Sequence, residues 1–368
     1  MMNHTLLYQF ESQLSAHLPS LNSWQQANVA LFSYGVMQAQ SCQQGALASQ
    51  INEHERLDSS VRRWQRWLDN EAVQLEAFFS EWSRWVVEAV DSPTISLVVD
   101  ETKLGDRIGV MLVGLAWQGR CVPLAWRTYP ANDSAAYPAE GQVKLIEALL
   151  QQIQAGIGSE RAVLVLADRG IGCSPDLCRA VAQLGWHYLF RVTCQTKIVT
   201  HAGTYTIAQQ VQPGDIWMQA GKVFKRRGRI PAHARAIWTV GYAEPWALVT
   251  NDAHLTGYEY ARRNWQEQSF RDLKSGGWRW GESRIRHADH VARLLVVLAI
   301  AYGWMVAFGS QAVDQGRCHT LIRTKAAHPA SPRRHWSLFK EGLRFWVEVL
   351  QRQTICPPLH FIPDKRFT

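Results

Sequence analysis

The chain has 368 residues, of which 47% are hydrophobic and 19% are charged. This composition excludes an intrinsically disordered chain, and the length predicts two or three domains or one domain with insertions. The net charge of +8 favours an anionic partner, with nucleic acid the first candidate. Seven scattered cysteines without a CxxC pair argue against a disulfide framework or a zinc site and fit a cytoplasmic protein.

The N-terminal region, residues 1–90, has apolar residues at helical spacing and few strand formers, which predicts helices. It begins without a basic segment followed by an apolar run, so we expect no signal peptide. Residues 41–68 fit a small helix-turn-helix-like unit, with Arg62, Arg63 and Arg66 on its last helix. A DNA-contacting role and a plain helical bundle fit this segment equally well.

After residue 93 the pattern changes to short buried strands separated by turns and two helices. Gln118 and Gly119 predict a tight hairpin turn between the second and third strands. The predicted strands are 94–100, 107–117, 120–130, 161–168 and 187–193, and the predicted helices are 140–156 and 174–185. The element order is therefore β-β-β-α-β-α-β, with Asp100 closing the first strand and Asp168 the fourth.

This order predicts where the two aspartates meet. If the first three strands form an antiparallel meander, a right-handed crossover lays the fourth strand parallel to the first. The carboxyl ends of parallel neighbours lie side by side, so Asp100 and Asp168 should converge at one edge of the sheet, where ligands bind in α/β proteins. The arrangement resembles a ribonuclease-H-like core with a mixed five-stranded sheet.

Residues 194–258 are rich in short Thr- and Val-containing strands and predict a β-rich insertion. It carries the densest basic run of the chain, which has no acidic residue. A solvated loop is the simplest interpretation, but Trp217 and Trp238 on either side favour contact with nucleic acid. The basic residues of this run are Lys222, Lys225, Arg226, Arg227 and Arg229.

The segment Tyr260–Lys274 places four polar side chains on one side of a predicted helix. At about 100° per residue, Tyr260, Arg263, Glu267 and Lys274 fall within a stripe roughly 60° wide. Taken alone, a solvated helix face with charged pairs is the simpler interpretation. Asp100 and Asp168 together need a third carboxylate, and this favours a working site.

Three carboxylates suit a two-metal phosphodiester chemistry. Two Mg²⁺ ions about 4 Å apart take Asp and Glu oxygens as ligands, and activate a water or 3′-hydroxyl while stabilising the leaving oxygen. Other acidic residues nearby are predicted to face elsewhere. Glu101 should point to the opposite face of its strand, and Asp272 lies about 140° around the helix from Glu267. His287, Asp289 and His290 could suggest a metal site, but a helix start capped by Asp289 fits better.

These residues resemble the DDE transposases of bacterial insertion sequences, in the subgroup with the YREK signature. Tyr260, Arg263, Glu267 and Lys274 match that signature with all three gaps correct, and LVVDET and LADRG resemble the strands that carry its two aspartates. The resemblance spans roughly residues 90–310. It implies that Asp100, Asp168 and Glu267 bind two Mg²⁺ ions, for which Mn²⁺ can substitute.

The resemblance also implies the partners and the roles of the other signature residues. Tyr260 and Arg263 would contact the phosphates of the transposon end, and Lys274 would position the terminal nucleotides. The enzyme would cut and paste double-stranded DNA between element ends and target, acting as a homodimer on DNA. Some relatives form a hairpin and hold a flipped base on a Trp. The sequence does not choose among Trp217, Trp238, Trp246, Trp265 and Trp278.

The last part of the chain is basic, with nine Lys or Arg and three Asp or Glu from 320 to 368. Before it, residues 291–308 approach the length of a membrane span, but a buried core helix is the better interpretation, and we expect no membrane partner. The expected regions are a helical DNA-binding region (1–90), the catalytic core (91–193 and 259–310), the β-rich insertion (194–258) and a basic tail for DNA or dimer contacts (311–368).

Two other functions compete with transposition. A DNA-binding protein that kept the fold but does not cut would need no intact set of three acids. A ribonuclease-H-like nuclease without transposition would cleave generic duplexes and join no 3′-hydroxyl to target DNA. Both alternatives are separable from a transposase by assays with purified protein.

Overall fold

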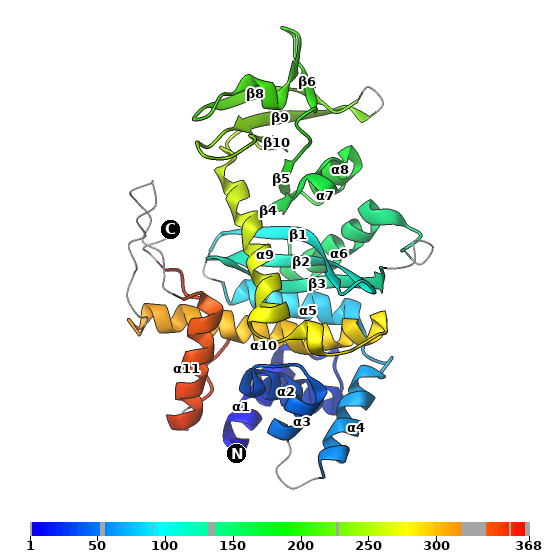
Figure 1. Ribbon diagram of the computed structural model, residues 1–368, viewed down its shortest axis with the longest axis vertical. Helices are drawn as coiled ribbons and strands as arrows, with labels where there is room; N and C mark the ends of the chain where they lie inside the picture. Colours follow the sequence, from blue (N-terminus) through cyan, green and yellow to red (C-terminus); the bar gives the residue numbers. More distant parts are fainter. Residues whose placement is uncertain are drawn as a thin grey trace.

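The computed structural model describes residues 2–51, 56–90, 92–131, 137–225, 228–317, 336–352 and 355–364. The elements are stacked along the long axis of the molecule (Figure 1). The N-terminal helices lie at one end, strands β6 and β8–β10 lie at the other, and the strands β1–β5 lie between them.

The N-terminal region is helical, as predicted. Asn22 begins the second helix with a reciprocal capping box, because its side chain accepts from the Gln25 backbone N–H at 3.0 Å while the Gln25 side chain accepts from the Asn22 N–H at 2.9 Å. Ser33 on the same helix donates a hydrogen bond to the Val297 carbonyl, which ties this region to the core. The helices are α1 (His4–His17), α2 (Ser23–Ala39), α3 (Gln44–Ile51), α4 (Leu57–Leu68) and α5 (Leu75–Glu88).

The centre of the fold is one mixed sheet of ten strands in the order β3-β2-β1-β4-β5-β10-β9-β8-β6-β7. Its first five strands, in the order β3-β2-β1-β4-β5, are the five that the sequence predicts. They are β1 (Thr94–Leu104), β2 (Ile108–Trp117), β3 (Arg120–Pro130), β4 (Ala162–Ala167) and β5 (His187–Arg191). Helix α6 (Gly141–Ile157) leads to β4, and α7 (Arg169–Gly172) and α8 (Pro175–Gln183) connect β4 to β5.

The predicted hairpin turn is confirmed. Trp117 pairs with Arg120 across the β2–β3 ladder, so Gln118 and Gly119 alone make the turn. Both have positive φ, 41° and 99°, as a two-residue turn of the I′ type requires. Glycine takes this backbone without strain, which explains its place after Gln118.

The predicted parallel crossover is also confirmed, and it sets the position of the two aspartates. Strand β1 pairs with β4 in parallel, and the last pair of that ladder is Val99 with Ala167. Asp100 directly follows Val99, and Asp168 directly follows Ala167, so the two aspartates lie side by side where the β1–β4 ladder ends. Strand β1 itself continues to Leu104 against β2, so the prediction that Asp100 ends its strand is wrong.

The β-rich region does not form a separate sheet. Strand β10 (Trp246–Thr250), which the sequence analysis did not identify as a strand, pairs with β5 on one side and β9 on the other. The ladder therefore runs without a break from the predicted five strands into the insertion, and a five-stranded sheet is an incomplete description. The remaining strands are β6 (Lys197–Val199), β7 (Thr204–Thr206), β8 (Ile216–Val223) and β9 (Ile230–Ile237), with the short helix η2 (Ile207–Gln210) between β7 and β8.

The segment with the YREK pattern crosses in front of β1–β3 (Figure 1) and is not one straight α-helix. It begins as the 3₁₀-helix η4 (Tyr258–Arg263), continues as the α-helix α9 (Asn264–Arg271) and ends in the π-helical turn η5 (Asp272–Gly276). The angular stripe calculated for a regular α-helix is therefore wrong in detail, because the three helix types rotate by different angles per residue. The short helix η6 (Trp280–Glu282) follows.

The apolar stretch around residues 291–308 is a core helix, as predicted. Helix α10 (Ala288–Asp314) is the one described helix long and apolar enough to cross a membrane, and that apolar part is completely buried inside the fold. It packs against β3 and α2 and against α11 (Leu338–Arg352). It begins after His287 without a side-chain cap, so Asp289 is not the cap that the sequence predicted. The expected division at residue 310 falls inside this helix.

Helices α10 and α11 touch backbone to backbone at two glycines. A Cβ at Gly342 of α11 would overlap the carbonyl group of Met305, and one at Gly309 of α10 would overlap that of Leu338. We expect Gly342→Ala to lower the free energy of unfolding by about 3 kcal/mol, because overpacking forces the helices apart. Chemical denaturation checks this.

Gly45 of α3 provides the matched control for Gly342, since nothing lies within 4 Å of a Cβ placed there. The Gly45→Ala substitution is expected to leave stability unchanged or raise it by up to about 1 kcal/mol, because Ala favours the helix. Equal losses of stability in both variants would contradict close packing at Gly342.

Candidate active site

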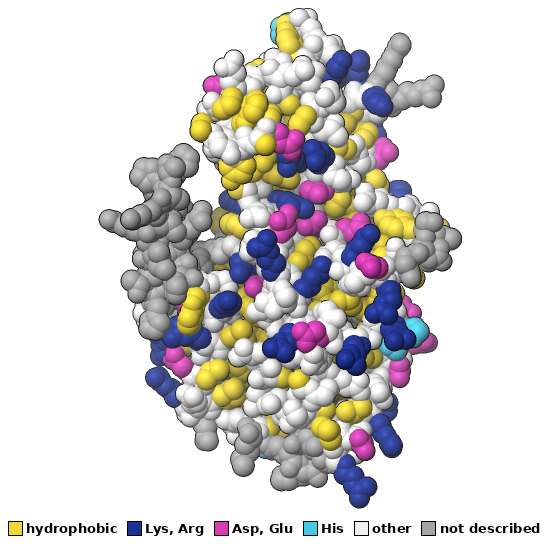
Figure 2. All heavy atoms as spheres, in the orientation of Figure 1, with side chains coloured by type: hydrophobic (Ala, Val, Ile, Leu, Met, Phe, Trp, Pro, Cys, Tyr) yellow, Lys and Arg dark blue, Asp and Glu magenta, His cyan; other side chains and the backbone are white. Residues whose placement is uncertain are grey.

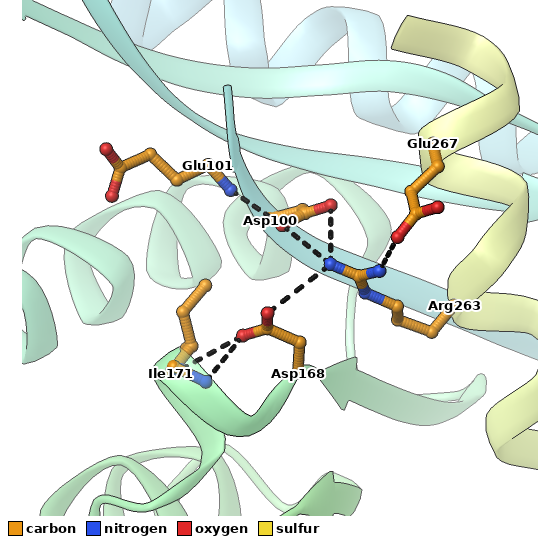
Figure 3. A network of polar contacts seen from close by, with 7 residues as sticks. Asp100, Glu101, Asp168, Ile171, Arg263 and Glu267 are labelled. Atoms are coloured by element: carbon orange, nitrogen blue, oxygen red, sulfur yellow. Dashed lines mark hydrogen bonds and ion pairs between the residues drawn. The ribbon is translucent and has the colours of Figure 1, made fainter. Parts of the chain in front are cut away.

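Three carboxylates from three separate elements converge on one arginine (Figure 3). The guanidinium of Arg263 at the end of η4 lies 3.1 Å from Asp100 Oδ2 and 3.4 Å from Asp168 Oδ2. Its other terminal nitrogen donates to Glu267 Oε1, one helical turn further along the chain. The predicted proximity of Asp100, Asp168 and Glu267 is therefore confirmed, and the positively charged guanidinium of Arg263 lies between them.

The Asp168 side chain is oriented by its own backbone. Its Oδ1 accepts hydrogen bonds from the N–H groups of Gly170 at 2.9 Å and Ile171 at 3.1 Å, which caps the short helix α7. Oδ2 is left to face Arg263. A Cβ at Gly170 would lie 3.3 Å from Oδ1, so glycine allows this close turn. The Asp-Arg-Gly order thus presents one carboxylate oxygen at the sheet edge.

The Asp100 carboxyl is the most buried of the three. Its side chain is 9% exposed and accepts from the Glu101 N–H at 3.0 Å. Burial raises the pKa of Asp100 to about 6; the Arg263 charge opposes this shift, while the charges of Asp168 and Glu267 add to it. The charges of Asp168 and Glu267 therefore lie close enough to disfavour ionisation of Asp100, which is the electrostatic character of a cation site.

The raised pKa makes the stability of the metal-free protein depend on pH. Between pH 4 and 6 the folded state binds more protons at Asp100 than the unfolded state does, so this contribution to stability is present at low pH and is lost as the pH rises through 6. Asp100→Asn removes the charge at every pH. We expect the variant to exceed wild type in free energy of unfolding by about 2 kcal/mol at pH 8, with no gain at pH 4.

Chemical denaturation in a metal chelator at the two pH values measures this difference. Asp106→Asn, at an exposed position in the turn after β1, controls for the loss of a carboxylate elsewhere on the same hairpin. A gap between wild type and Asp100→Asn that is the same at pH 4 and pH 8 would show that the Asp100 carboxyl is not the titrating group.

Tyr260 does not lie on an exposed polar stripe. Its ring is buried in an apolar cluster with Leu166 and Leu248 and makes an edge contact with Trp246, with ring centroids 5.2 Å apart. Burial raises the pKa of the Tyr260 hydroxyl, and the charge of Arg263 partly opposes this rise. The hydroxyl is therefore close enough to Arg263 to feel the charges of the site. In a 3₁₀-helix residues three apart eclipse one another, which places Tyr260 and Arg263 on the same side. The ring anchors η4 to the sheet.

Lys274 approaches the same site from the π-helical turn η5. Lys274 is half-buried, and this burial lowers the pKa of its amine. The negative charge of Asp100 opposes the shift only in part. The π-helical turn rotates the chain less per residue than an α-helix does, so the position of Lys274 did not follow from regular spacing. The structure brings Lys274 toward Asp100 nonetheless.

Two other acids near the site face away from it, as predicted. In Figure 3 the carboxyl of Glu101 points to the opposite side of β1 from that of Asp100. Asp272 is buried and pairs with Arg120 at 2.5 Å. Away from the site, His290 lies in the first turn of α10, so this segment is a helix start as predicted, and its ring pairs with Asp69 at 2.9 Å.

The three carboxylates have the chemistry to bind a divalent metal ion. In this structure the positive charge between them is the guanidinium of Arg263. Asp and Glu oxygens are the ligands that Mg²⁺ and Mn²⁺ take in proteins. Within the described ranges no group of three or more His, Cys, Asp or Glu residues could hold a metal ion as placed. The guanidinium of Arg263 separates the three acids. Asp100, Asp168 and Glu267 would therefore hold a metal only after Arg263 withdraws.

The basic run of the insertion lies apart from the carboxylates. Lys225 and Arg229 are exposed and line a cavity of about 790 Å³ together with Lys197 of β6 and Phe224. Lys222 is exposed on β8. Arg226 and Arg227 lie outside the described residues. No described residue of this run has a hydrogen bond or ion pair to the three acids, so its role in DNA binding stays a prediction.

Two arginines beside the site were missed by the sequence analysis. Arg169 directly follows Asp168, and Arg191 ends β5; both pair with Glu244, at 3.5 Å and 2.5 Å. Burial raises the pKa of Tyr260, and the Arg191 charge partly opposes this rise, so Arg191 lies close to the site as well. Their positions next to the ends of β4 and β5 indicate both residues, because each lies at the same sheet edge as Asp168. Acidic side chains gather midway down the molecule with basic ones around them (Figure 2).

Fold and site together define an α/β protein with a carboxylate cluster at the carboxyl edge of parallel strands. Residues 138–304 match the transposase DDE domain family, and this match supports a DDE transposase. The matched range includes Asp168 and Glu267 and begins after Asp100.

A search of curated proteins finds no match. Among solved structures, the crystal structure of human ENDOV is similar over 62% of this chain and 98% of its own. The sequence identity is 14% and the TM-score is 0.26, a likeness too distant to define the fold.

Proposed function

We propose that this protein is a metal-dependent cut-and-paste transposase that binds the terminal inverted repeats of an insertion sequence, cleaves the DNA ends and joins them to target DNA. The convergence of Asp100, Asp168 and Glu267 on a single cation carries the proposal. The match of residues 138–304 to transposase DDE domains supports it. The strand order β3-β2-β1-β4-β5, with β4 parallel to β1, supports the ribonuclease-H-like core.

Each side chain has a defined role in this proposal. Asp100, Asp168 and Glu267 would hold two Mg²⁺ or Mn²⁺ ions, and such ions activate the attacking oxygen and stabilise the leaving oxygen of a phosphodiester. Arg263, released from the carboxylates, would bind a DNA phosphate through its planar fork of donors. Lys274 would place a positive charge beside the terminal nucleotide. The buried ring of Tyr260 would hold η4 and direct its hydroxyl to the same phosphates.

Double-stranded DNA is the substrate in this proposal, and the YREK subgroup of bacterial insertion sequences is the source that the residue spacing favours. The net charge of +8 suits binding to phosphates. The basic run of the insertion, the N-terminal helices and the C-terminal segment would extend the contact with DNA. A homodimer would hold two element ends together.

The decisive experiment uses purified protein and a labelled duplex that carries the inverted repeats flanking its gene. With Mg²⁺ or Mn²⁺ we expect cleavage at the repeat end and joining of the free 3′-hydroxyl to a target plasmid. Binding to the repeat without cleavage would identify an inactive DNA-binding protein. Cleavage of any duplex without joining would identify a nuclease. Either outcome would overturn the proposed transposase.

A further inference from the structure

Asp272 lies at the junction between the two segments that bring side chains to the site. Five residues before it is Glu267 of α9, and two residues after it is Lys274. The helix changes there from α to π geometry, and the Asp272 carbonyl accepts a hydrogen bond from the Trp278 N–H at 3.0 Å. Any movement of Asp272 therefore moves both segments.

The Asp272 carboxylate is held from two sides by other elements. Arg120 at the start of β3 donates through Nε at 2.5 Å, and the hydroxyl of Tyr302 on α10 lies 3.0 Å from the same oxygen. The side chains of Asp272 and Arg120 are only 7% and 14% exposed. A buried, charge-assisted contact of this kind is strongly directional, and removing one partner leaves the other charge buried and unpaired.

A second contact locks the same end of α9 in register with β3. Ser269 Oγ accepts from the Cys121 N–H at 2.7 Å and lies 3.0 Å from the hydroxyl of Tyr302. Close packing accompanies these bonds, because a Cβ at Gly114 of β2 would lie 2.7 Å from the side chain of Gln266, next to Glu267. The sheet, α9 and α10 therefore meet at one polar network beneath the helix face that carries Glu267.

We propose that Asp272, held by Arg120 and Tyr302, is a positioning residue that sets the placement of Glu267 and Lys274 relative to Asp100 and Asp168. This inference rests on the proposed function, since it assigns Asp272 to the support of the metal-binding acids. Asp272 faces the sheet and α10 and contacts neither Asp100 nor Asp168. It acts through the helix backbone.

Asp272→Asn tests the inference, because it keeps the size of the side chain and removes the charge that holds Arg120. We expect hydrogen–deuterium exchange to increase at the amides of residues 264–276 in the metal-free protein, while α10 stays protected. We also expect the affinity for Mn²⁺, measured by calorimetry, to fall about tenfold. The DNA cleavage rate should fall with it, at an unchanged affinity for DNA.

A double-mutant cycle separates positioning from general loosening of the fold. In a Glu267→Gln background, Asp272→Asn should cause no further loss of Mn²⁺ affinity, because the side chain that it positions no longer carries the charge. Equal losses in both backgrounds would overturn the inference. Tyr302→Phe keeps the ring that stacks on Phe339 and removes only the hydroxyl, so a smaller effect in the same direction is expected from a variant that retains its packing.

Asp176→Asn is the matched control, since Asp176 forms an exposed pair with Arg179 at the same distance of 2.5 Å. In Asp176→Asn, the hydrogen–deuterium exchange at residues 264–276 and the affinity for Mn²⁺ should equal those of wild type. The exchange measurement needs neither metal nor DNA. A wild-type protein that neither binds Mn²⁺ nor cuts DNA would defeat the proposed function, whereas unchanged exchange at 264–276 in Asp272→Asn would defeat the positioning role alone.

Discussion

Glu267→Gln is expected to reduce DNA cleavage by about a thousandfold or more while the folded protein remains intact. A neutral amide cannot replace the charge of a metal-binding carboxylate, and such ligands contribute several kcal/mol to the stabilisation of the transition state. The Glu267 side chain is 45% exposed, and it has no role in the core. Single-turnover cleavage of a pre-nicked repeat end measures the cleavage rate, and a parallel thermal melt measures the stability of the folded protein.

The affinity of Glu267→Gln for the repeat DNA should stay within a few-fold of wild type, because the basic residues around the site are untouched. Glu147→Gln on α6, where Glu147 pairs with Lys144 at 2.7 Å, is the control for loss of a glutamate charge. Cleavage by Glu267→Gln at the wild-type rate would remove this residue from the proposed metal set and leave the transposase assignment without its third acid.

Arg263→Ala is expected to have opposite effects on stability and on metal affinity. Removing the guanidinium leaves Asp100, Asp168 and Glu267 facing one another, so the metal-free variant should lose about 2 kcal/mol or more of unfolding free energy. In this variant a divalent metal ion no longer competes with the Arg263 guanidinium for the three carboxylates. We therefore expect Mn²⁺ to bind at least about tenfold more tightly and to restore the lost stability.

Calorimetry with Mn²⁺ and thermal melts with and without the metal measure this exchange of one cation for another. Arg271→Ala is the matched control, because Arg271 is an exposed arginine at the end of α9, the helix that directly follows η4. It should change neither the stability of the metal-free protein nor the affinity for Mn²⁺. Weaker Mn²⁺ binding by Arg263→Ala would mean that the guanidinium does not occupy the place of a metal ion.

Much of the core was predictable because local rules dominate there. The turn at Gln118–Gly119 follows from the positive φ that two residues between antiparallel strands require. The placement of Asp100 beside Asp168 follows from the handedness of the crossover, which allows a single parallel arrangement of β1 and β4. A continuous apolar run also identified α10 as a core helix.

The contacts of the site depended on interactions between distant segments. Helical periodicity assumes one helix type, but Tyr260 sits in a 3₁₀ turn and Lys274 in a π turn. Burial of the Tyr260 ring depends on Leu166 and Leu248, which come from other strands. The network of Asp272 with Arg120 and Tyr302 joins residues more than 29 positions apart in the chain.

The amino-acid pattern was thus sufficient to predict three acids, the common sheet edge of Asp100 and Asp168, and the resemblance to DDE transposases. Strand order and charge type are encoded locally, in periodicity and in residue identity. Tertiary packing alone decided that Arg263 lies between the acids, that β10 joins the insertion to the core sheet, and that Asp272 anchors the helix of Glu267. Those outcomes depend on contacts between residues far apart in the chain, and spacing along the sequence does not specify which contacts form.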